Sequence, residues 1–281
     1  MWSSQTNWEE LRPPTFDFDE IHFVGQEAAK KQLEPFIDKE VFPNTLIIGE
    51  PGLGKTQLAK WVASQRKAPA QLHRNLPITD NDLDPELNFV ILDEVHMQKD
   101  AEWFFPLMES EEWAIIGTTN LPEKLSDAFL SRFIVRVRLR PYTVEDMKKM
   151  AELLDVEFQA SPNDLDAIAT ASGGNPRQLQ RLVSTAQALG TFDPEIVLST
   201  VRINADGVTE DHLLYLQQLS KMSRPVGIAY LASAARVDQP TLKGLERLLL
   251  DLELISLEPN GRIMTGKGRA YLALMKERGL V

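Results

Sequence analysis

The sequence contains no cysteine, which excludes disulfide, zinc-thiolate and thiol chemistry. No apolar run approaches the roughly 20 residues that cross a bilayer, and the start, Met1 to Trp8, lacks the apolar core of a signal peptide. Basic residues are few, with 30 Lys and Arg against 41 Asp and Glu, a net charge of −11. We therefore expect a cytoplasmic protein without a membrane segment, whose surface is not basic throughout but can still carry a local basic element.

The 281 residues make the chain about twice the usual domain size, so two or three units are expected. A composition of 43% hydrophobic and 25% charged residues is that of a globular protein and excludes disordered and collagen-like classes. The first twenty residues lack periodicity and indicate an arm or linker. From Gly25 onward the pattern becomes regular.

The first half of the chain alternates short apolar runs with helical patterns. Four strands are predicted at 44–49, 89–93, 113–118 and 135–139, and two helices at 26–37 and 57–64. Apolar strands separated by helices are typical of a parallel sheet covered on both faces. We predict an α/β domain over residues 1–140, including the arm.

After Pro141 the pattern is helical. Helices are predicted at 144–154, 163–171, 175–188 and from 193 to about 202, with Thr143, Ser161, Asn175 and Asp193 at their starts. This predicts an all-α domain over 141–205, and residues 204–207 are the best linker candidate.

The pattern of the remainder, 206–281, predicts helices at 210–221, 226–236 and 240–252, a hairpin with an Asn260-Gly261 turn, and a last helix after Gly268. Three helices and a two-stranded wing describe a winged helix.

A phosphate-loop pattern follows the first predicted strand. Its glycines allow a tight loop whose N–H groups point at phosphate oxygens, at the start of a helix. Lys55 would contact the β- and γ-phosphates, and Thr56 would hold Mg²⁺. The pattern predicts an ATP site with these cofactor-binding residues: Gly49, Pro51, Gly52, Gly54, Lys55, Thr56 and Gln57.

Polar residues end the next two predicted strands. Asp93 is placed to orient the Mg²⁺ shell and Glu94 to polarise an attacking water, because ionised carboxylates rarely end a buried strand without a cation partner. Asn120 ends the following strand and could orient that water or contact the γ-phosphate. His96 is predicted to be a partly buried structural histidine. Arg132 lies twelve residues after Asn120.

With these motifs in this order, the chain resembles the AAA+ ATPases, and among them the RuvB family of Holliday-junction branch-migration motors. The resemblance includes Leu11-Arg12-Pro13, Val24-Gly25-Gln26 and the sequence Asp93-Glu94-Val95-His96. It implies four further roles: Asn120 as sensor 1, where threonine is more usual, Arg132 as arginine finger, Arg177 as sensor 2, and Tyr142 beside the adenine. It also implies a homo-oligomer, expected to be a hexamer, that moves or remodels duplex DNA or four-way junctions.

One departure concerns the hairpin through which the family docks its partner RuvA. Only Ser110 to Trp113 separate Met108-Glu109 from the predicted strand, so the hairpin has no room. This counts against docking of RuvA in the family's manner. It also keeps an alternative open, in which the chain is a clamp-loader-, helicase-loader- or initiator-type ATP switch that docks a protein partner.

The charge is unevenly distributed along the chain. Residues 210–281 carry ten basic and eight acidic residues, about +2, whereas residues 1–209 carry 20 and 33, or −13. Arg262, Lys267 and Arg269 are candidates for contacts to the DNA backbone. The alternative, an ordinary solvated face or a protein-docking module, stays open.

Overall fold

The computed structural model describes residues 21–74, 76–99, 101–154 and 160–278. The chain divides into two compact units, Met1–Tyr142 and Thr143–Val281. The N-terminal arm and the Leu11-Arg12-Pro13 motif lie outside the described residues. In the part of the chain that is described, no helix is both long and apolar enough to cross a membrane.

The first unit contains a parallel five-stranded sheet, as the apolar runs predict for its class. The strand order is β2-β3-β4-β1-β5. The bounds are β1 Thr45–Ile48, β2 Ala70–His73, β3 Phe89–Leu92, β4 Ala114–Thr119 and β5 Val135–Arg138. The predicted number of four strands is wrong, because β2 has no continuous apolar run. Its Gln71 is buried, and the amide donates hydrogen bonds to the carbonyls of Asp84 and Leu87.

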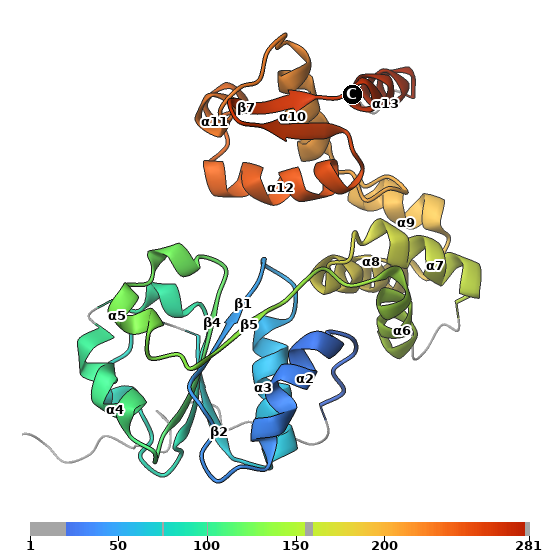
Figure 1. The fold of residues 1–281 in the computed structure, drawn as a ribbon. Helices are drawn as coiled ribbons and strands as arrows, with labels where there is room; N and C mark the ends of the chain where they lie inside the picture. The colour runs from blue at the N-terminus through green and yellow to red at the C-terminus, as the bar shows by residue number, and fades with distance from the viewer. Residues whose placement is uncertain (1–20, 75, 100, 155–159, 279–281) are drawn as a thin grey trace, which may run out of the picture. The chain divides into compact units, whose positions relative to one another are not determined.

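Helices cover both faces of this sheet (Figure 1). One face carries α2 (Glu27–Ile37) and α3 (Lys55–Arg66), and the other carries α4 (Phe105–Glu109) and α5 (Asp127–Leu130). Single turns of 3-10 helix lie at Asp80–Asp82, Val95–Met97, Ala101–Phe104 and Pro122–Lys124. Because every strand runs in the same direction, the loops that follow β1, β3 and β4 meet at one edge of the sheet.

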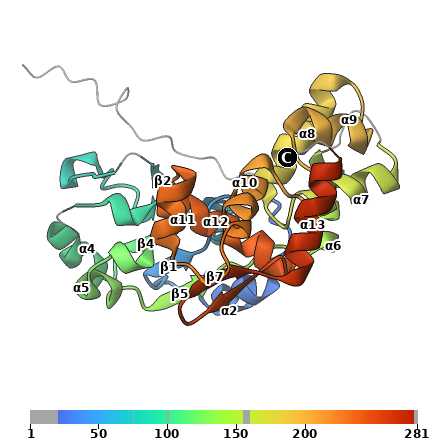
Figure 2. The ribbon, with the colours of Figure 1, turned by 90° about the horizontal axis from the view of Figure 1, so that it is seen from above.

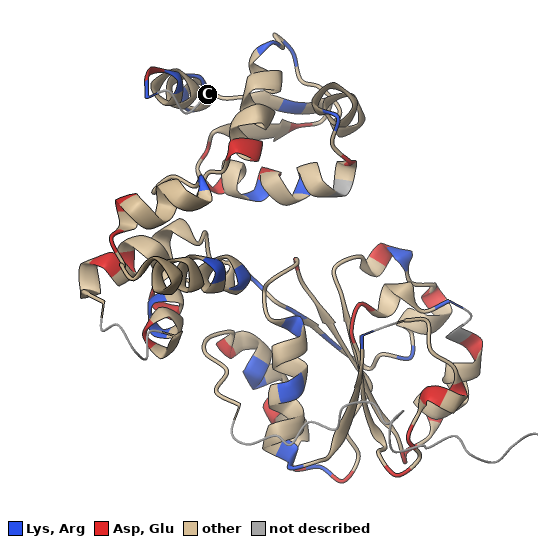
Figure 3. Ribbon diagram, turned by 180° about the vertical axis from the view of Figure 1, so that it is seen from behind, with Lys and Arg blue, Asp and Glu red and all other residues tan. Residues whose placement is uncertain are grey.

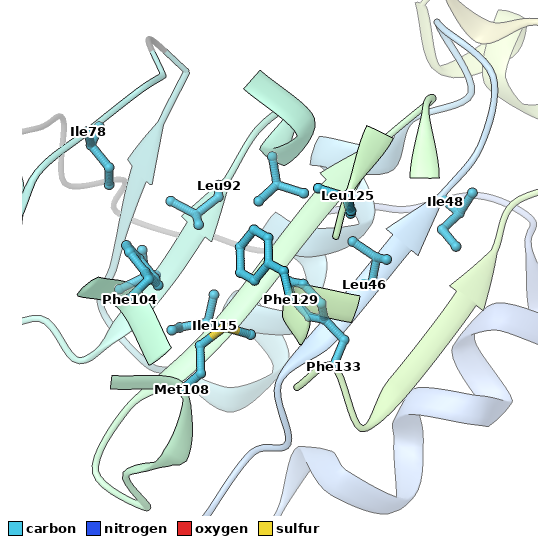
Figure 4. Close-up of a cluster of buried hydrophobic side chains, with 12 residues drawn as sticks. Leu46, Ile48, Ile78, Leu92, Phe104, Met108, Ile115, Leu125, Phe129 and Phe133 are labelled. Atoms are coloured by element: carbon cyan, nitrogen blue, oxygen red, sulfur yellow. The ribbon is translucent and has the colours of Figure 1, made fainter. Parts of the chain in front are cut away.

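The core beneath α4 and α5 is mostly aliphatic and includes the buried rings of Phe104, Phe129 and Phe133 (Figure 4). Phe129 packs against Phe105 and Phe133 with ring centroids 6.1 and 5.4 Å apart. Asn44 lies buried at the start of β1 and holds three elements together: its amide donates to the Met108 carbonyl, and its Oδ1 accepts from the Ile115 N–H. These contacts fix α4 and α5 relative to the sheet.

The second unit begins with four helices: α6 Val144–Leu154, α7 Pro162–Ala171, α8 Pro176–Leu189 and α9 Pro194–Val201. The predicted cap Thr143 accepts a hydrogen bond from the Asp146 N–H over 3.2 Å, and the three predicted caps that precede a proline are confirmed as well. Ser161, Asn175 and Asp193 each accept a hydrogen bond from a backbone N–H in the first turn of their helix. A proline at the first helical position follows each of these three caps, where its missing N–H costs nothing.

The chain then forms a winged helix, as predicted (Figure 2). Its elements are α10 Glu210–Ser220, α11 Ile228–Ala235, α12 Gln239–Asp251, β6 Ile255–Glu258, β7 Gly261–Met264 and α13 Gly266–Glu277. The strands pair antiparallel across a two-residue Pro259-Asn260 loop, and Val226 adds an isolated bridge to Arg262. A Cβ at Gly261 would lie 2.2 Å from the Val226 carbonyl oxygen, so only glycine fits there.

Residues 204–207, the linker candidate, form a tight turn. The Asn204 Oδ1 accepts hydrogen bonds from the N–H groups of Asp206 and Val208, and its amide donates to the Tyr271 hydroxyl on α13. The chain is therefore held at this point by the winged helix. The division of the second unit at residues 205 and 206 stays a prediction.

Candidate nucleotide-binding site

The phosphate loop connects β1 to α3. Gly52 and Gly54 have φ values of +86° and +84°, which side chains rarely adopt, and Gly54 directly precedes the first residue of α3. The Gly49 N–H donates to the Thr119 carbonyl over 3.2 Å, which fastens the loop to β4. The N–H groups at the start of α3 thus face the same edge of the sheet as the ends of β3 and β4, and such a helix start favours phosphate.

Lys55 is the buried cation of the loop. Its side chain is 5% exposed, and its Nζ lies 3.3 Å from the Glu50 carbonyl oxygen and 3.4 Å from Glu94 Oε1. A buried ammonium requires a nearby acceptor, and here both acceptors belong to the site itself. Lys55 is therefore held where an entering phosphate would meet it.

Asp93 receives two hydroxyl hydrogen bonds on one oxygen. Thr56 and Thr118 each donate to Asp93 Oδ1 over 2.7 Å, from α3 and β4 respectively. Thr118 is fully buried, and its Oγ1 accepts from the Glu94 N–H over 3.1 Å. A hydroxyl beside a carboxylate fits Mg²⁺, which usually takes one or two carboxylates together with substrate phosphates. Among the described residues no group of three or more His, Cys, Asp or Glu side chains forms a separate metal site.

Glu94 follows Asp93 in a left-handed conformation, with φ +54°. Its Oε1 faces Lys55, and its Oε2 is buried, accepts no hydrogen bond and lies 3.3 Å from His96 Nδ1. His96 Nδ1 is also 3.0 Å from Thr119 Oγ1, and burial lowers the pKa of this imidazole. His96 is therefore a largely buried group beside Glu94 and the end of β4, and its structural role stays a prediction.

Asn120 follows β4 directly. Its Oδ1 is the second buried acceptor at this edge of the sheet without a hydrogen-bond partner. Buried polar atoms are rarely left without a hydrogen-bond partner. Glu94 Oε2 and Asn120 Oδ1 together therefore fit a site that receives a ligand carrying hydrogen-bond donors. Tyr142 completes the surroundings of the loop: its hydroxyl donates to the Leu53 carbonyl over 3.2 Å, and a Cβ at Gly54 would lie 3.4 Å from it.

Arg132 lies in the short connection between α5 and β5. Its Nε and Nη2 donate to Glu109 Oε1 over 3.0 and 2.7 Å, and its Nη1 donates to the Ala128 carbonyl over 2.6 Å. The guanidinium carbon is 3.7 Å from the centre of the Phe105 ring. None of these partners belongs to the phosphate loop or to the ends of β3 and β4.

The remaining predicted residues lie in the second unit. Arg177 is in the first turn of α8, where its N–H donates to the Asn175 cap, and its contact with a nucleotide stays a prediction.

Basic and acidic residues are interspersed on the winged helix (Figure 3). Arg262 is paired with Glu246, whereas Lys267 is 60% exposed and lies 3.3 Å from Glu253. Arg269 Nη2 donates to the Met264 carbonyl over 3.4 Å.

Residues 205–273 match the family model of the RuvB C-terminal winged helix domain. A Holliday junction branch migration complex subunit RuvB of Thermotoga petrophila is 28% identical, over 93% of this chain and 92% of its own. The Mycoplasma genitalium subunit is 24% identical, over 94% of this chain and 98% of its own. The solved Thermotoga maritima RuvB Holliday junction branch migration motor superposes with a TM-score of 0.76 and 27% identity, covering 94% of this chain and 98% of that one. The chain is a RuvB-like AAA+ protein. Its likeness to the AAA domain of FIGL-1, solved with ADP, is in the fold alone, with a TM-score of 0.52 and 19% identity.

In this RuvB-like chain the connection between α4 and β4 is short. Residues Ser110 to Trp113 join the two elements without a strand of their own. The backbone turns at once, because the Ser110 N–H bonds back to the carbonyls of Pro106 and Leu107. The expectation that this segment has no room for a hairpin is confirmed.

Several residues of the RuvB-like site were not singled out from the sequence. Thr118 and Thr119 look like ordinary β-branched strand residues, and Glu109 looks like one acid among several. Only the pairing of β3 with β4, in which Leu92 lies opposite Gly117, brings the hydroxyl of Thr118 to Asp93. For Thr118 and Thr119 the one sequence signal was their position, at the end of an apolar strand that follows a strand ending in Asp-Glu.

Proposed function

We propose that this RuvB-like protein is an ATP-hydrolysing motor that moves the branch point of Holliday junctions. One observation carries the proposal: the likeness to the Thermotoga maritima branch migration motor runs through both units and covers 94% of this chain and 98% of that one. A nucleotide site of suitable composition and a RuvB-type winged helix support it. The loader- or initiator-type alternative has no comparable support.

In this proposal the first unit binds ATP with Mg²⁺. The N–H groups of the loop would hold the phosphates and Lys55 would contact them, with the loop and its surroundings formed by Gly49, Pro51, Gly52, Gly54, Gln57 and Tyr142. Thr56 and Asp93 would hold Mg²⁺, whose contribution when bound is to neutralise charge on the phosphate oxygens. On binding, the phosphates would replace Glu94 as the partner of Lys55.

Hydrolysis would depend on Glu94 and Asn120. Once the Lys55 ammonium is paired with phosphate, the Glu94 carboxylate can accept a proton from the attacking water. The unpaired Oδ1 of Asn120 can accept a hydrogen bond from the other hydrogen of the same water molecule. Arg132 would act on the nucleotide of a neighbouring copy, since its contacts with the described part of its own chain are to Phe105, Glu109 and Ala128, away from the phosphate loop. Arg177 would contact the γ-phosphate from α8. This arrangement requires head-to-tail neighbours, and we propose that they close into a ring of six copies.

DNA would be bound through its backbone by the winged helix. Lys267 and Arg269 lie in the first turn of α13 and, among the described residues, have only weak or single contacts, so their donors can reach phosphates. Arg262 is a weaker candidate because its charge is paired with Glu246. Without a hairpin between α4 and β4, the protein would act on junctions without docking RuvA in the family's manner.

The test is branch migration of a labelled four-way junction by the full chain, with ATP and Mg²⁺ and no second protein. We expect ATP-dependent separation of the junction arms. Glu94→Gln should bind ATP but reduce turnover by about 10²-fold or more, as expected for loss of a general base. The control is Glu112→Gln, an exposed acid in the connection before β4. ATP turnover that responds to a sliding clamp or a replicative helicase, with no migration of any junction, would instead support the loader alternative.

A further inference from the structure

The contacts of Arg132 form a defined set. We name the finger support the three groups that hold its guanidinium: the Phe105 ring, the Glu109 carboxylate and the Ala128 carbonyl. Arg132 is 25% exposed and Glu109 61% exposed. The ion pair is thus at the surface, where a single pair would hold a long side chain only weakly. Here the Phe105 ring and the Ala128 carbonyl hold the guanidinium in addition to the ion pair.

The geometry leaves part of the guanidinium available. An arginine has five N–H donors in a rigid plane. Glu109 Oε1 receives one from Nε and one from Nη2, and the Ala128 carbonyl receives one from Nη1. Among the described residues no further acceptor is bound to Arg132, so two donors remain for a second oxyanion. The side chain is therefore held by one part of its edge while another part stays free.

The support is itself rigidly placed. Phe105 packs on Phe129 of α5, and Phe129 packs on Phe133. Glu109 is the last residue of α4, whose Met108 carbonyl accepts a hydrogen bond from the buried Asn44. The elements that carry Phe105, Glu109 and Ala128 are thus fastened to each other and to the sheet.

We propose that Glu109 and Phe105 are positioning residues of the arginine finger, which hold Arg132 ready for the nucleotide phosphate of a neighbouring copy of this chain. This rests on the proposed function. Ordering a free arginine costs side-chain entropy in each catalytic cycle, and a guanidinium that is already oriented avoids that cost at the moment of reaction. Glu109 would act through Arg132 and would not touch the nucleotide itself.

The test compares ATP turnover of the full chain on junction DNA for the wild type, Arg132→Ala, Glu109→Ala and Glu109→Gln. We expect Glu109→Ala to lower kcat about tenfold and to leave KM for ATP within about twofold, because the variant's own phosphate loop is untouched. Glu109→Gln should stay within about threefold of wild type, since one oxygen, Oε1, accepts both hydrogen bonds and an amide oxygen can replace it. The matched control, Glu111→Ala, removes the same charge two residues away and should turn over like wild type.

Mixing separates a positioning role from a folding defect. A Glu109→Ala subunit has an intact nucleotide site, and a Lys55→Ala subunit has an intact finger, so mixed rings should turn over ATP faster than the sum of the two variants measured separately. No recovery, or a Glu109→Ala variant that is as active as wild type or more active, would overturn the inference. If Arg132→Ala itself hydrolysed ATP at the wild-type rate, the assignment of Arg132 as arginine finger in the proposed function would be rejected as well. Loss in Arg132→Ala with none in Glu109→Ala would reject only the inference.

Discussion

Arg262 Nε donates a hydrogen bond to Glu246 Oε1 over 2.6 Å, and the two side chains are only 18% and 8% exposed. Arg262 Nη2 reaches Glu246 Oε2, and the Tyr215 hydroxyl donates to Oε1 over 2.7 Å. Burial, together with this carboxylate, raises the pKa of Tyr215. Strand β7 is thereby joined to α12 and α10 through one buried acid.

Loss of that acid should destabilise the winged helix. Glu246→Ala leaves the Arg262 charge and the Tyr215 hydroxyl without their acceptor, and we expect a cost of about 3 kcal/mol. Hydrogen exchange of the α10 and α12 amides measures it locally. The control is Asp251→Ala, which removes an exposed partner of Arg247 and should cost less than about 0.5 kcal/mol. Equal protection in the two variants would contradict a structural role for the buried pair.

The second unit should lose stability in mild acid because of His212. Burial lowers the pKa of this imidazole from 6.5 to about 4, and its Nδ1 accepts the Thr209 N–H in a capping box at the start of α10. Between these two pH values the unfolded chain binds a proton that the folded chain does not, so stability falls as the pH falls below 6.5. From pH 7 to pH 5 we expect a loss of about 2 kcal/mol from this group. The measurement is hydrogen-exchange protection of α10 at the two pH values.

His212→Gln is the matched variant for this prediction. Glutamine suits the same position of a capping box and does not titrate, so the cap is kept while the proton linkage is removed. The variant should lose less α10 protection than the wild type between pH 7 and pH 5. An unchanged pH dependence would assign the acid sensitivity to other groups.

The Thr118 hydroxyl should matter for Mg²⁺. Thr118→Val keeps the shape of a fully buried side chain but removes the donor to Asp93 Oδ1 and the acceptor of the Glu94 N–H. Groups that orient a metal ligand typically contribute 10- to 100-fold, so we expect ATP turnover to need about tenfold more Mg²⁺. Thr45→Val is the control, because that equally buried hydroxyl donates to the Pro43 carbonyl on the same sheet. A wild-type Mg²⁺ midpoint in Thr118→Val would count against the role of Asp93.

Two glycines of the winged helix should respond in opposite ways to alanine. A Cβ at Gly268 would lie 2.0 Å from the Leu254 carbonyl oxygen, so Gly268→Ala must push α13 away from the residue that precedes β6 and should lower the melting temperature of the second unit. Gly244 lies exposed inside α12 with nothing within 4 Å of such a Cβ. Gly244→Ala should stabilise the helix by about 1 kcal/mol, the difference in helix propensity. Calorimetry of both variants checks the pair: a higher melting temperature for Gly268→Ala would contradict the close packing at Gly268, and a lower one for Gly244→Ala would contradict the open space at Gly244.

Local patterns in the sequence determined the parts of this protein whose physics is local. Pro after Ser161, Asn175 or Asp193 marks a helix start because the cap and the missing N–H act within one turn. The glycines before Lys55 mark the phosphate loop because only glycine readily takes its positive φ angles. The short connection before β4 was visible as a residue count.

Only the tertiary structure decided which distant groups meet. Strand β2 was missed because its buried Gln71 is satisfied by carbonyls thirteen and sixteen residues away, which no periodicity records. Thr118 reaches Asp93 because β3 and β4 are neighbours in the sheet, and Arg262 reaches Glu246 because the wing packs on α12. In the same way, the spacing of Arg132 after Asn120 indicates a role for this arginine, but only the packing of α4 against α5 places Glu109 and Phe105 in contact with it. Spacing along a chain predicts which residues have a role, whereas hydrogen bonds and ring contacts between separate elements determine what each of them can do.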